Sequence, residues 1–218
     1  MSRLAIAVSL IASLSTAALA DRVSEPSFGS LPTHFAEAPD NYAAVAVPVS
    51  RAAIRAKLAQ NRVANLARFR VYQQKGVFPN NTFSDGKLNV WLDDSGNLCA
   101  AATIIKLSGN ADLAMRTADQ NNFIKLGDVT QGPLMDWILT SGLTQSEIAA
   151  IQEPFRPVVQ EPAPQPIDAR MRRAENRRLA AKYKQVDASI VKNKNASLDA
   201  ATDRLLSNRE LASKFLNG

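Results

Sequence analysis

Cysteine and histidine are the residue types here that could form a nucleophilic pair, and the chain has one of each. A thiolate at Cys99 activated by the imidazole of His34 would be the centre of a Cys-dependent hydrolase acting on peptide or glycan bonds. Cys99 lies in an apolar run, residues 98–101, whereas His34 lies in a Pro-rich segment. We therefore expect Cys99 to be a buried structural residue, and the Cys-dependent envelope hydrolase is the alternative hypothesis.

Metal and cofactor sites find little support in the sequence. A single Cys and a single His exclude a multi-Cys zinc or iron–sulfur site and a His-rich metal site. The acidic loop Asp93–Asn97 has Gly at its fourth position and no Glu to close it, unlike a calcium-binding EF-hand loop, so it predicts a turn. No Gly-rich phosphate loop, serine nucleophile elbow or zinc-protease pattern occurs. We expect no cofactor, no metal and a non-enzymatic role.

Basic residues form the second group that could do chemistry, and their distribution is uneven. Residues 41–84 hold seven basic residues and no acid, residues 85–167 carry a net charge of −5, and residues 168–194 carry +6. One interpretation packs the first basic segment against the acidic middle and leaves the tail solvated. The other brings the tail to an anionic polymer, a membrane surface or a protein partner. The candidate binding residues are Arg170, Arg172, Arg173, Arg177, Arg178, Lys182 and Lys184.

The N-terminus is typical of an export signal. Residues 1–20 combine an early Arg3, an apolar stretch and a small-residue ending, which predicts a signal peptide cleaved before Asp21 and a periplasmic or secreted protein. Residues 21–49 are predicted to form an extended, Pro-containing leader. Export makes nucleic acid a poor partner. The segment Gly142–Ala149 resembles part of a helix-turn-helix, but Pro154 forbids the recognition helix that should follow.

The elements that must position these residues are mainly helical. Ser50 is a plausible N-cap for a helix that runs to about Lys75, and shorter helices are expected at 111–123, from Pro133 to about 141, and at 144–152. The apolar runs 88–92 and 98–107, joined by the acidic loop, predict a two-stranded β-hairpin. The expected fold class is therefore α+β, with helices covering the hairpin.

The C-terminal part is predicted to be separate from this domain. The domain is expected to span residues 50–155, and residues 156–166 form a stiff Pro-rich linker. Beyond it, residues 167–218 are expected to form a basic amphipathic helical tail, interrupted near 193–195. The thin apolar stripe of this tail indicates that it docks on the domain or self-associates.

A resemblance covers about half of the chain. The stretches Arg70–Tyr72, Gly76–Asn80, Asp94–Ala100 and Trp137–Gln152, in this order and spacing, resemble a group of uncharacterised exported bacterial proteins. The resemblance spans residues 51–155 and implies a recurring exported domain without a known activity. We therefore expect an exported cell-envelope protein that acts as a binding module, with its basic tail in contact with an anionic surface or a partner.

Overall fold

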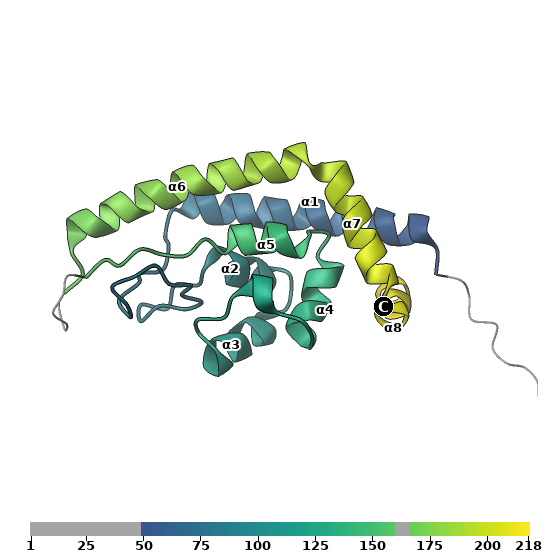
Figure 1. The fold of residues 1–218 in the computed structure, drawn as a ribbon, viewed down its shortest axis with the longest axis horizontal. Helices are drawn as coiled ribbons and strands as arrows, with labels where there is room; N and C mark the ends of the chain where they lie inside the picture. The colour runs from purple at the N-terminus through teal and green to yellow at the C-terminus, as the bar shows by residue number, and fades with distance from the viewer. Residues whose placement is uncertain (1–48, 160–165) are drawn as a thin grey trace, which may run out of the picture. The chain divides into compact units, whose positions relative to one another are not determined.

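The computed structural model describes residues 49–159 and 166–218, which belong to one unit, Ala46–Gly218. The predicted signal peptide, most of the leader with His34, and the centre of the predicted linker lie outside the described residues. The helices in Figure 1 are α1 (Arg51–Lys75), α2 (Ala100–Leu107), α3 (Ala111–Gln120), the 3₁₀ turn η1 (Leu126–Asp128), α4 (Pro133–Thr140), α5 (Gln145–Ile151), α6 (Ala169–Lys192), α7 (Lys194–Leu206) and α8 (Arg209–Asn217).

Helix α1 is the element against which most of the others pack, and it confirms the predicted first helix. The Ser50 side chain accepts a hydrogen bond from the Ala53 N–H, and Gly76 ends the helix with a φ of 64°, a left-handed conformation that favours glycine. Its apolar side chains contact α2 on one side and α6, α7 and α8 on others. Consequently α1 is buried along much of its length.

The predicted β-hairpin is wrong. About 65% of the described residues are helical and no strand is present among them. Residues 100–107 form α2 instead, with Cys99 as N-cap, and α2 is buried between α1 and α3. A continuous apolar run has no period that separates a buried strand from a buried helix. The three alanines at its start favour the helix, and burial on several sides suits it.

The first half of the predicted hairpin is extended but pairs elsewhere. Leu88 exchanges two backbone hydrogen bonds with Phe155, at 3.0 and 2.9 Å, and the Trp91 N–H donates to the Asn122 carbonyl at 2.8 Å. A single antiparallel bridge, Leu92 to Leu98, remains around the acidic turn. The predicted turn is therefore present, but its flanks do not form a ladder.

Helices α4 and α5 begin near the predicted positions. Pro133 occupies the first turn of α4, and Thr144 and Glu147 form a capping box at the start of α5, each bonding the other's backbone N–H. Gly142 joins the two helices with a φ of 78°. A Cβ at this position would lie 2.1 Å from the Leu58 carbonyl oxygen, so only glycine lets this turn touch α1.

The C-terminal helices lie against α1 rather than apart from it. Helix α6 runs alongside α1 in Figure 1, and the chain bends at Asn193 into α7, near the predicted interruption. Tyr183 of α6 is fully buried and makes edge-on ring contacts with Phe69 and Phe78 at centroid distances of 5.5 and 5.4 Å. The tail therefore shares the main hydrophobic core.

A second, smaller core joins the two ends of the described chain. Ile54 and Leu58 of α1 pack with Leu198 and Leu205 of α7 and with Ala212 of α8. Before α6, Val158 is buried and its N–H donates to the Asn81 carbonyl.

No helix in the described part of the chain is long and apolar enough to span a lipid bilayer.

Candidate functional site

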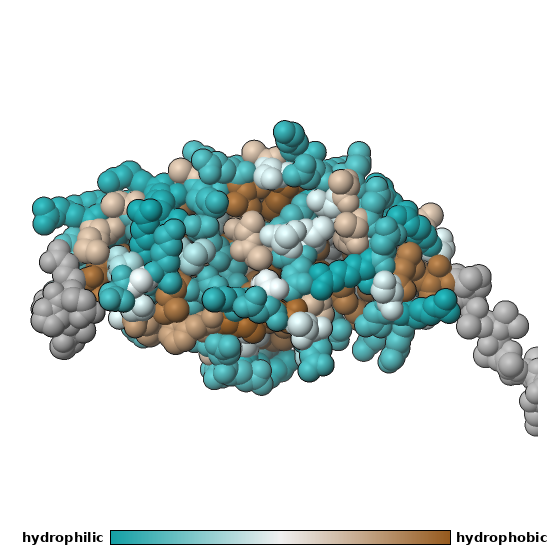
Figure 2. Space-filling view, in the orientation of Figure 1, coloured by the Kyte–Doolittle hydropathy of each residue, from teal (hydrophilic) through white to brown (hydrophobic). Residues whose placement is uncertain are grey.

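The seven candidate basic residues all lie on α6, but in two different environments. Five are exposed: Arg170, Arg172, Arg173, Arg177 and Lys184. Arg178 and Lys182 are partly covered, on the side of α6 that faces Glu153. In the orientation of Figure 2, hydrophilic residues predominate along the upper edge, where Figure 1 shows α6.

Arg178 holds the start of α6 to the preceding chain. Its guanidinium donates to both carboxylate oxygens of Glu175, at 2.8 and 2.7 Å, to the Glu153 carboxylate and to the Pro154 carbonyl at 2.8 Å. Hydrogen bonds to Glu175, and then to Glu153, raise the pKa of Arg178 above its usual value despite partial burial. Lys182 lies 4.0 Å from Glu153. We assign both residues to the architecture of the tail.

Four of the exposed residues form a stripe. Arg170, Arg173, Arg177 and Lys184 are separated by three, four and seven residues, a spacing that places them on one face of a helix. The buried residues of α6 lie on the opposite face: Glu175, Leu179, Tyr183, Val186 and Ile190. We call these four residues the α6 basic stripe; it extends about 21 Å at a rise of 1.5 Å per residue.

Acidic side chains of α6 do not neutralise the stripe. The helix contains two acids: Glu175 is bound by Arg178, and Asp187 pairs with Arg70 of α1 at 3.2 Å. At its N-cap, Asp168 accepts hydrogen bonds from the backbone of the first turn. Within the described residues, none of the four residues of the stripe forms an ion pair with a carboxylate at 4.0 Å or less. The stripe is therefore a band of exposed positive charge, and Asp168 at the start of the helix attracts Arg170 and Arg173 electrostatically.

The basic residues of α1 are used differently. Instead of meeting mainly the acidic middle, three of its arginines pair with acids of the tail. These pairs are Arg51 with Asp203 at 2.8 Å, Arg55 with Asp199 at 2.7 Å, and Arg70 with Asp187 at 3.2 Å. Three acids of the tail are thus engaged by α1, and the four residues of the stripe form no ion pair within the described part of the chain.

One buried ion pair connects α1, α5, α6 and α7. The Arg62 guanidinium, 1% exposed, binds both Glu147 oxygens at 2.8 and 2.7 Å and donates to the carbonyls of Gly142 and Ile190. Glu147 also accepts from the Thr144 N–H, and from the hydroxyl of Ser197. Burial alone would raise the pKa of Glu147, but these hydrogen bonds outweigh it and hold the pKa below its usual value.

Cys99 lies in the core and not in a cleft. The side chain is 1% exposed, and its sulfur accepts a hydrogen bond from the Ala102 N–H at 3.5 Å, which caps α2. Burial raises the pKa of the thiol to about 12, so it is a neutral thiol at physiological pH. His34, its proposed partner, lies outside the described residues. A buried thiol of this kind is not a nucleophile, and its position argues for a structural role.

The acidic loop is held in place by hydrogen bonds to the Asp93 carboxylate. Asp93 is 5% exposed and accepts hydrogen bonds from the backbone and side-chain nitrogens of both Asn80 and Asn97 at 2.8–3.1 Å, and from the Ser95 N–H. Its oxygens are therefore committed to holding the turn together. Within the described residues, no group of three His, Cys, Asp or Glu side chains could hold a metal ion.

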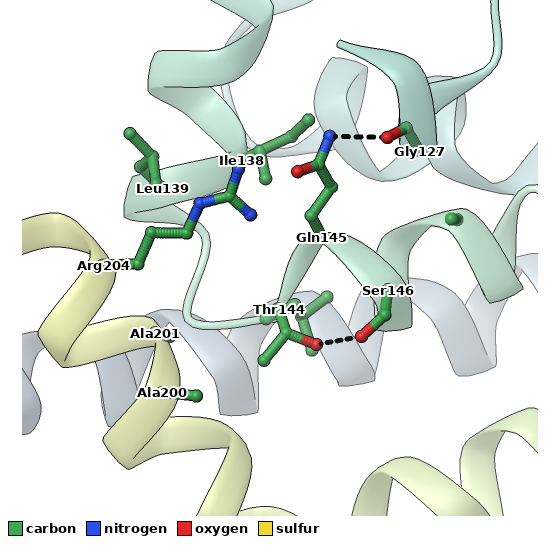
Figure 3. Close-up of a pocket in the computed structure, with 11 residues that line it drawn as sticks. Gly127, Ile138, Leu139, Thr144, Gln145, Ser146, Ala200, Ala201 and Arg204 are labelled. Atoms are coloured by element: carbon green, nitrogen blue, oxygen red, sulfur yellow. Dashed lines mark hydrogen bonds between the residues drawn. The ribbon is translucent and has the colours of Figure 1, made fainter. Parts of the chain in front are cut away.

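A pocket that sequence reasoning missed lies between α4, α5 and α7. It has a volume of about 630 Å³, and Arg204 of α7 points toward it (Figure 3). Its lining comes from short segments that are distant in the sequence, so no local motif indicates it.

Comparisons of the chain with models of protein families, with curated protein sequences and with solved structures find no match.

Proposed function

We propose that this protein is an exported, non-enzymatic binding module of the cell envelope, which contacts an anionic surface through the α6 basic stripe. The observation that carries the proposal is the stripe itself, with Arg170, Arg173, Arg177 and Lys184 solvated on the face opposite the core. Clustered positive charge attracts anionic surfaces over a distance of about one Debye length.

The internal pairing of several other basic residues supports this choice. Arg51, Arg55 and Arg70 of α1 each have a carboxylate partner in the tail. Arg178 and Lys182 face Glu153. Because these groups serve the fold, they are not available to an external surface, whereas the stripe presents four exposed charges on one face of a rigid helix. A rigid stripe does not lose backbone entropy when it meets a flat surface, unlike a disordered basic segment.

The magnitude of the expected effect follows from the number of charges. Each Lys or Arg near an anionic membrane contributes about 1 kcal/mol at moderate ionic strength. Neutralising all four residues of the stripe should therefore weaken partition onto anionic vesicles by roughly two to three orders of magnitude. Added salt should weaken binding of the unmodified chain in the same direction.

The test is sedimentation of the protein with vesicles, with and without phosphatidylglycerol. The variant replaces Arg170, Arg173, Arg177 and Lys184 by Gln. A matched variant removes the same charge elsewhere, at four exposed residues: Lys87, Arg116, Lys125 and Arg209. Point substitutions are needed, because deleting residues 167–218 would also remove core side chains such as Tyr183.

The proposal predicts salt-sensitive binding to the anionic vesicles that the stripe variant loses and the matched variant largely keeps. Binding that depends equally on both variants would mean that net charge, and not the stripe, is responsible. Failure of the unmodified chain to bind anionic vesicles at low salt would refute a lipid surface as the target.

A further inference from the structure

The pocket between α4, α5 and α7 has an apolar interior. Ile138 and Leu139 of α4 and Leu143 of the following turn contribute large side chains to the lining, and Ala149 and Ala201 contribute small ones. Its volume of about 630 Å³ lies in the range of about 300–1,000 Å³ that is usual for small-molecule sites. An apolar body of moderate size therefore fits there.

A positive charge stands beside this apolar interior. Arg204 is exposed on α7, and Figure 3 shows its guanidinium between Leu139 and Gln145. The recorded contact of the guanidinium is weak, with one nitrogen 4.0 Å from the Met135 sulfur. No ion pair involving Arg204 is found in the described part of the chain, whereas the adjacent Asp203 is held by Arg51. The guanidinium thus keeps its capacity to bind an anion in two contacts.

The polar side chains around the pocket are fixed in place. The Gln145 amide nitrogen donates to the carbonyls of Leu126, Gly127 and Val129 at 2.7–3.2 Å, which anchors its side chain at the wall. The hydroxyls of Thr144 and Ser146 lie 3.0 Å apart and bond to each other (Figure 3). These contacts preform the wall, which lowers the entropy that a ligand must overcome on binding.

We propose that this pocket binds a small amphiphile with one carboxylate head group and an apolar body. In this arrangement the carboxylate pairs with Arg204 at the rim, and the apolar body occupies the space bounded by Ile138, Leu139 and Leu143. Charge complementarity selects the anionic head, and the apolar lining excludes ions without a hydrophobic body. The inference is independent of the α6 basic stripe, since the two involve different residues.

The experiment is calorimetric titration of the full chain with decanoate, decan-1-ol and acetate. Decanoate has both the apolar body and the carboxylate, decan-1-ol has the apolar body alone, and acetate has the carboxylate alone. Their affinities therefore separate the contribution of the apolar body from that of the carboxylate. Arg204→Gln removes the charge at the rim. Ala200→Phe fills the pocket from an exposed position on α7, and Arg209→Gln is a matched loss of charge outside the pocket. Circular dichroism establishes that each variant is folded.

The proposal predicts saturable binding of one decanoate, no binding of acetate, and at least tenfold weaker binding of decan-1-ol. Arg204→Gln should weaken decanoate binding by about tenfold or more, Ala200→Phe should abolish it, and Arg209→Gln should leave it unchanged. The proposal is overturned if decanoate does not bind, if decan-1-ol binds as tightly, or if folded Arg204→Gln or Ala200→Phe binds decanoate as the unmodified chain does.

Discussion

Replacing Glu147 by Gln should destabilise the protein far more than any exposed charge substitution. The change leaves the Arg62 guanidinium, 1% exposed, without its bidentate carboxylate partner. Breaking a buried ion pair from one side costs about 3–5 kcal/mol, because a charge stays buried and unpaired. The substitution also weakens the acceptor for the Thr144 N–H and the Ser197 hydroxyl. We therefore expect a loss of at least about 3 kcal/mol.

Urea unfolding followed by circular dichroism measures this loss directly. For a domain of this size it corresponds to a fall in Tm of about 6–20 °C. The matched control is Asp203→Asn, which breaks the exposed pair with Arg51, and it should cost less than about 1 kcal/mol. If Glu147→Gln were no more destabilising than Asp203→Asn, the buried pair would not be what connects α5 to α1, α6 and α7.

The same pair should make stability depend on pH in the acid range. Because the folded-state pKa of Glu147 is lowered from 4.5, its contribution is complete above that value and is lost as the pH falls through the folded pKa. Glu147→Gln removes this titration. The difference in unfolding free energy between the two proteins should therefore shrink below about pH 4.5. A constant difference between pH 7 and pH 3 would contradict this assignment.

Three further substitutions or treatments test the packing. Gly142→Ala should prevent folding, because at a φ of 78° the new Cβ would lie 2.1 Å from the Leu58 carbonyl oxygen. Gly96→Ala is the control: Gly96 also has a positive φ but lies in open space, so this substitution should cost only about 1–2 kcal/mol. The yield of folded protein distinguishes the two variants. The Cys99 thiol should react with a disulfide reagent only after unfolding, and rapid labelling of the native protein would show that it is accessible. Arg178→Gln should accelerate amide exchange in the first turns of α6, and unchanged exchange would deny its clamping role.

The sequence predicts the ends of helices better than their partners. Ser50 and Gly76 enclose α1, and Thr144 and Glu147 begin α5, because caps are local hydrogen bonds between residues close in the chain. The prediction of a strand in the run 98–107 fails because its apolar side chains have no period that separates strand from helix, and the conformation depends on what surrounds the run. Local hydrogen bonds such as helix caps can be predicted from one sequence, whereas the tertiary packing around a segment cannot.

The candidate site likewise has features that the sequence predicts and features that depend on tertiary contacts. The excess of positive charge in the tail is visible as composition, but the separation of Arg178 from the stripe depends on Glu153, which is distant in the sequence. The pairing of Arg62 with Glu147 has no local signal either, since 85 residues separate them. Arg204 becomes notable only when α4 and α5 are placed beside it.

The most direct test of the central claim is to find which face of the protein meets an anionic surface. An environment-sensitive dye can be attached to Ala181→Cys, an exposed position between Arg177 and Lys184, or to Ser95→Cys in the exposed acidic turn. The native Cys99 is buried and does not compete for the label. Vesicles containing phosphatidylglycerol should change the emission of the dye at position 181 and not at position 95, and salt should reverse the change. A response at position 95, or none at position 181, would contradict the assignment of the α6 basic stripe as the contact surface.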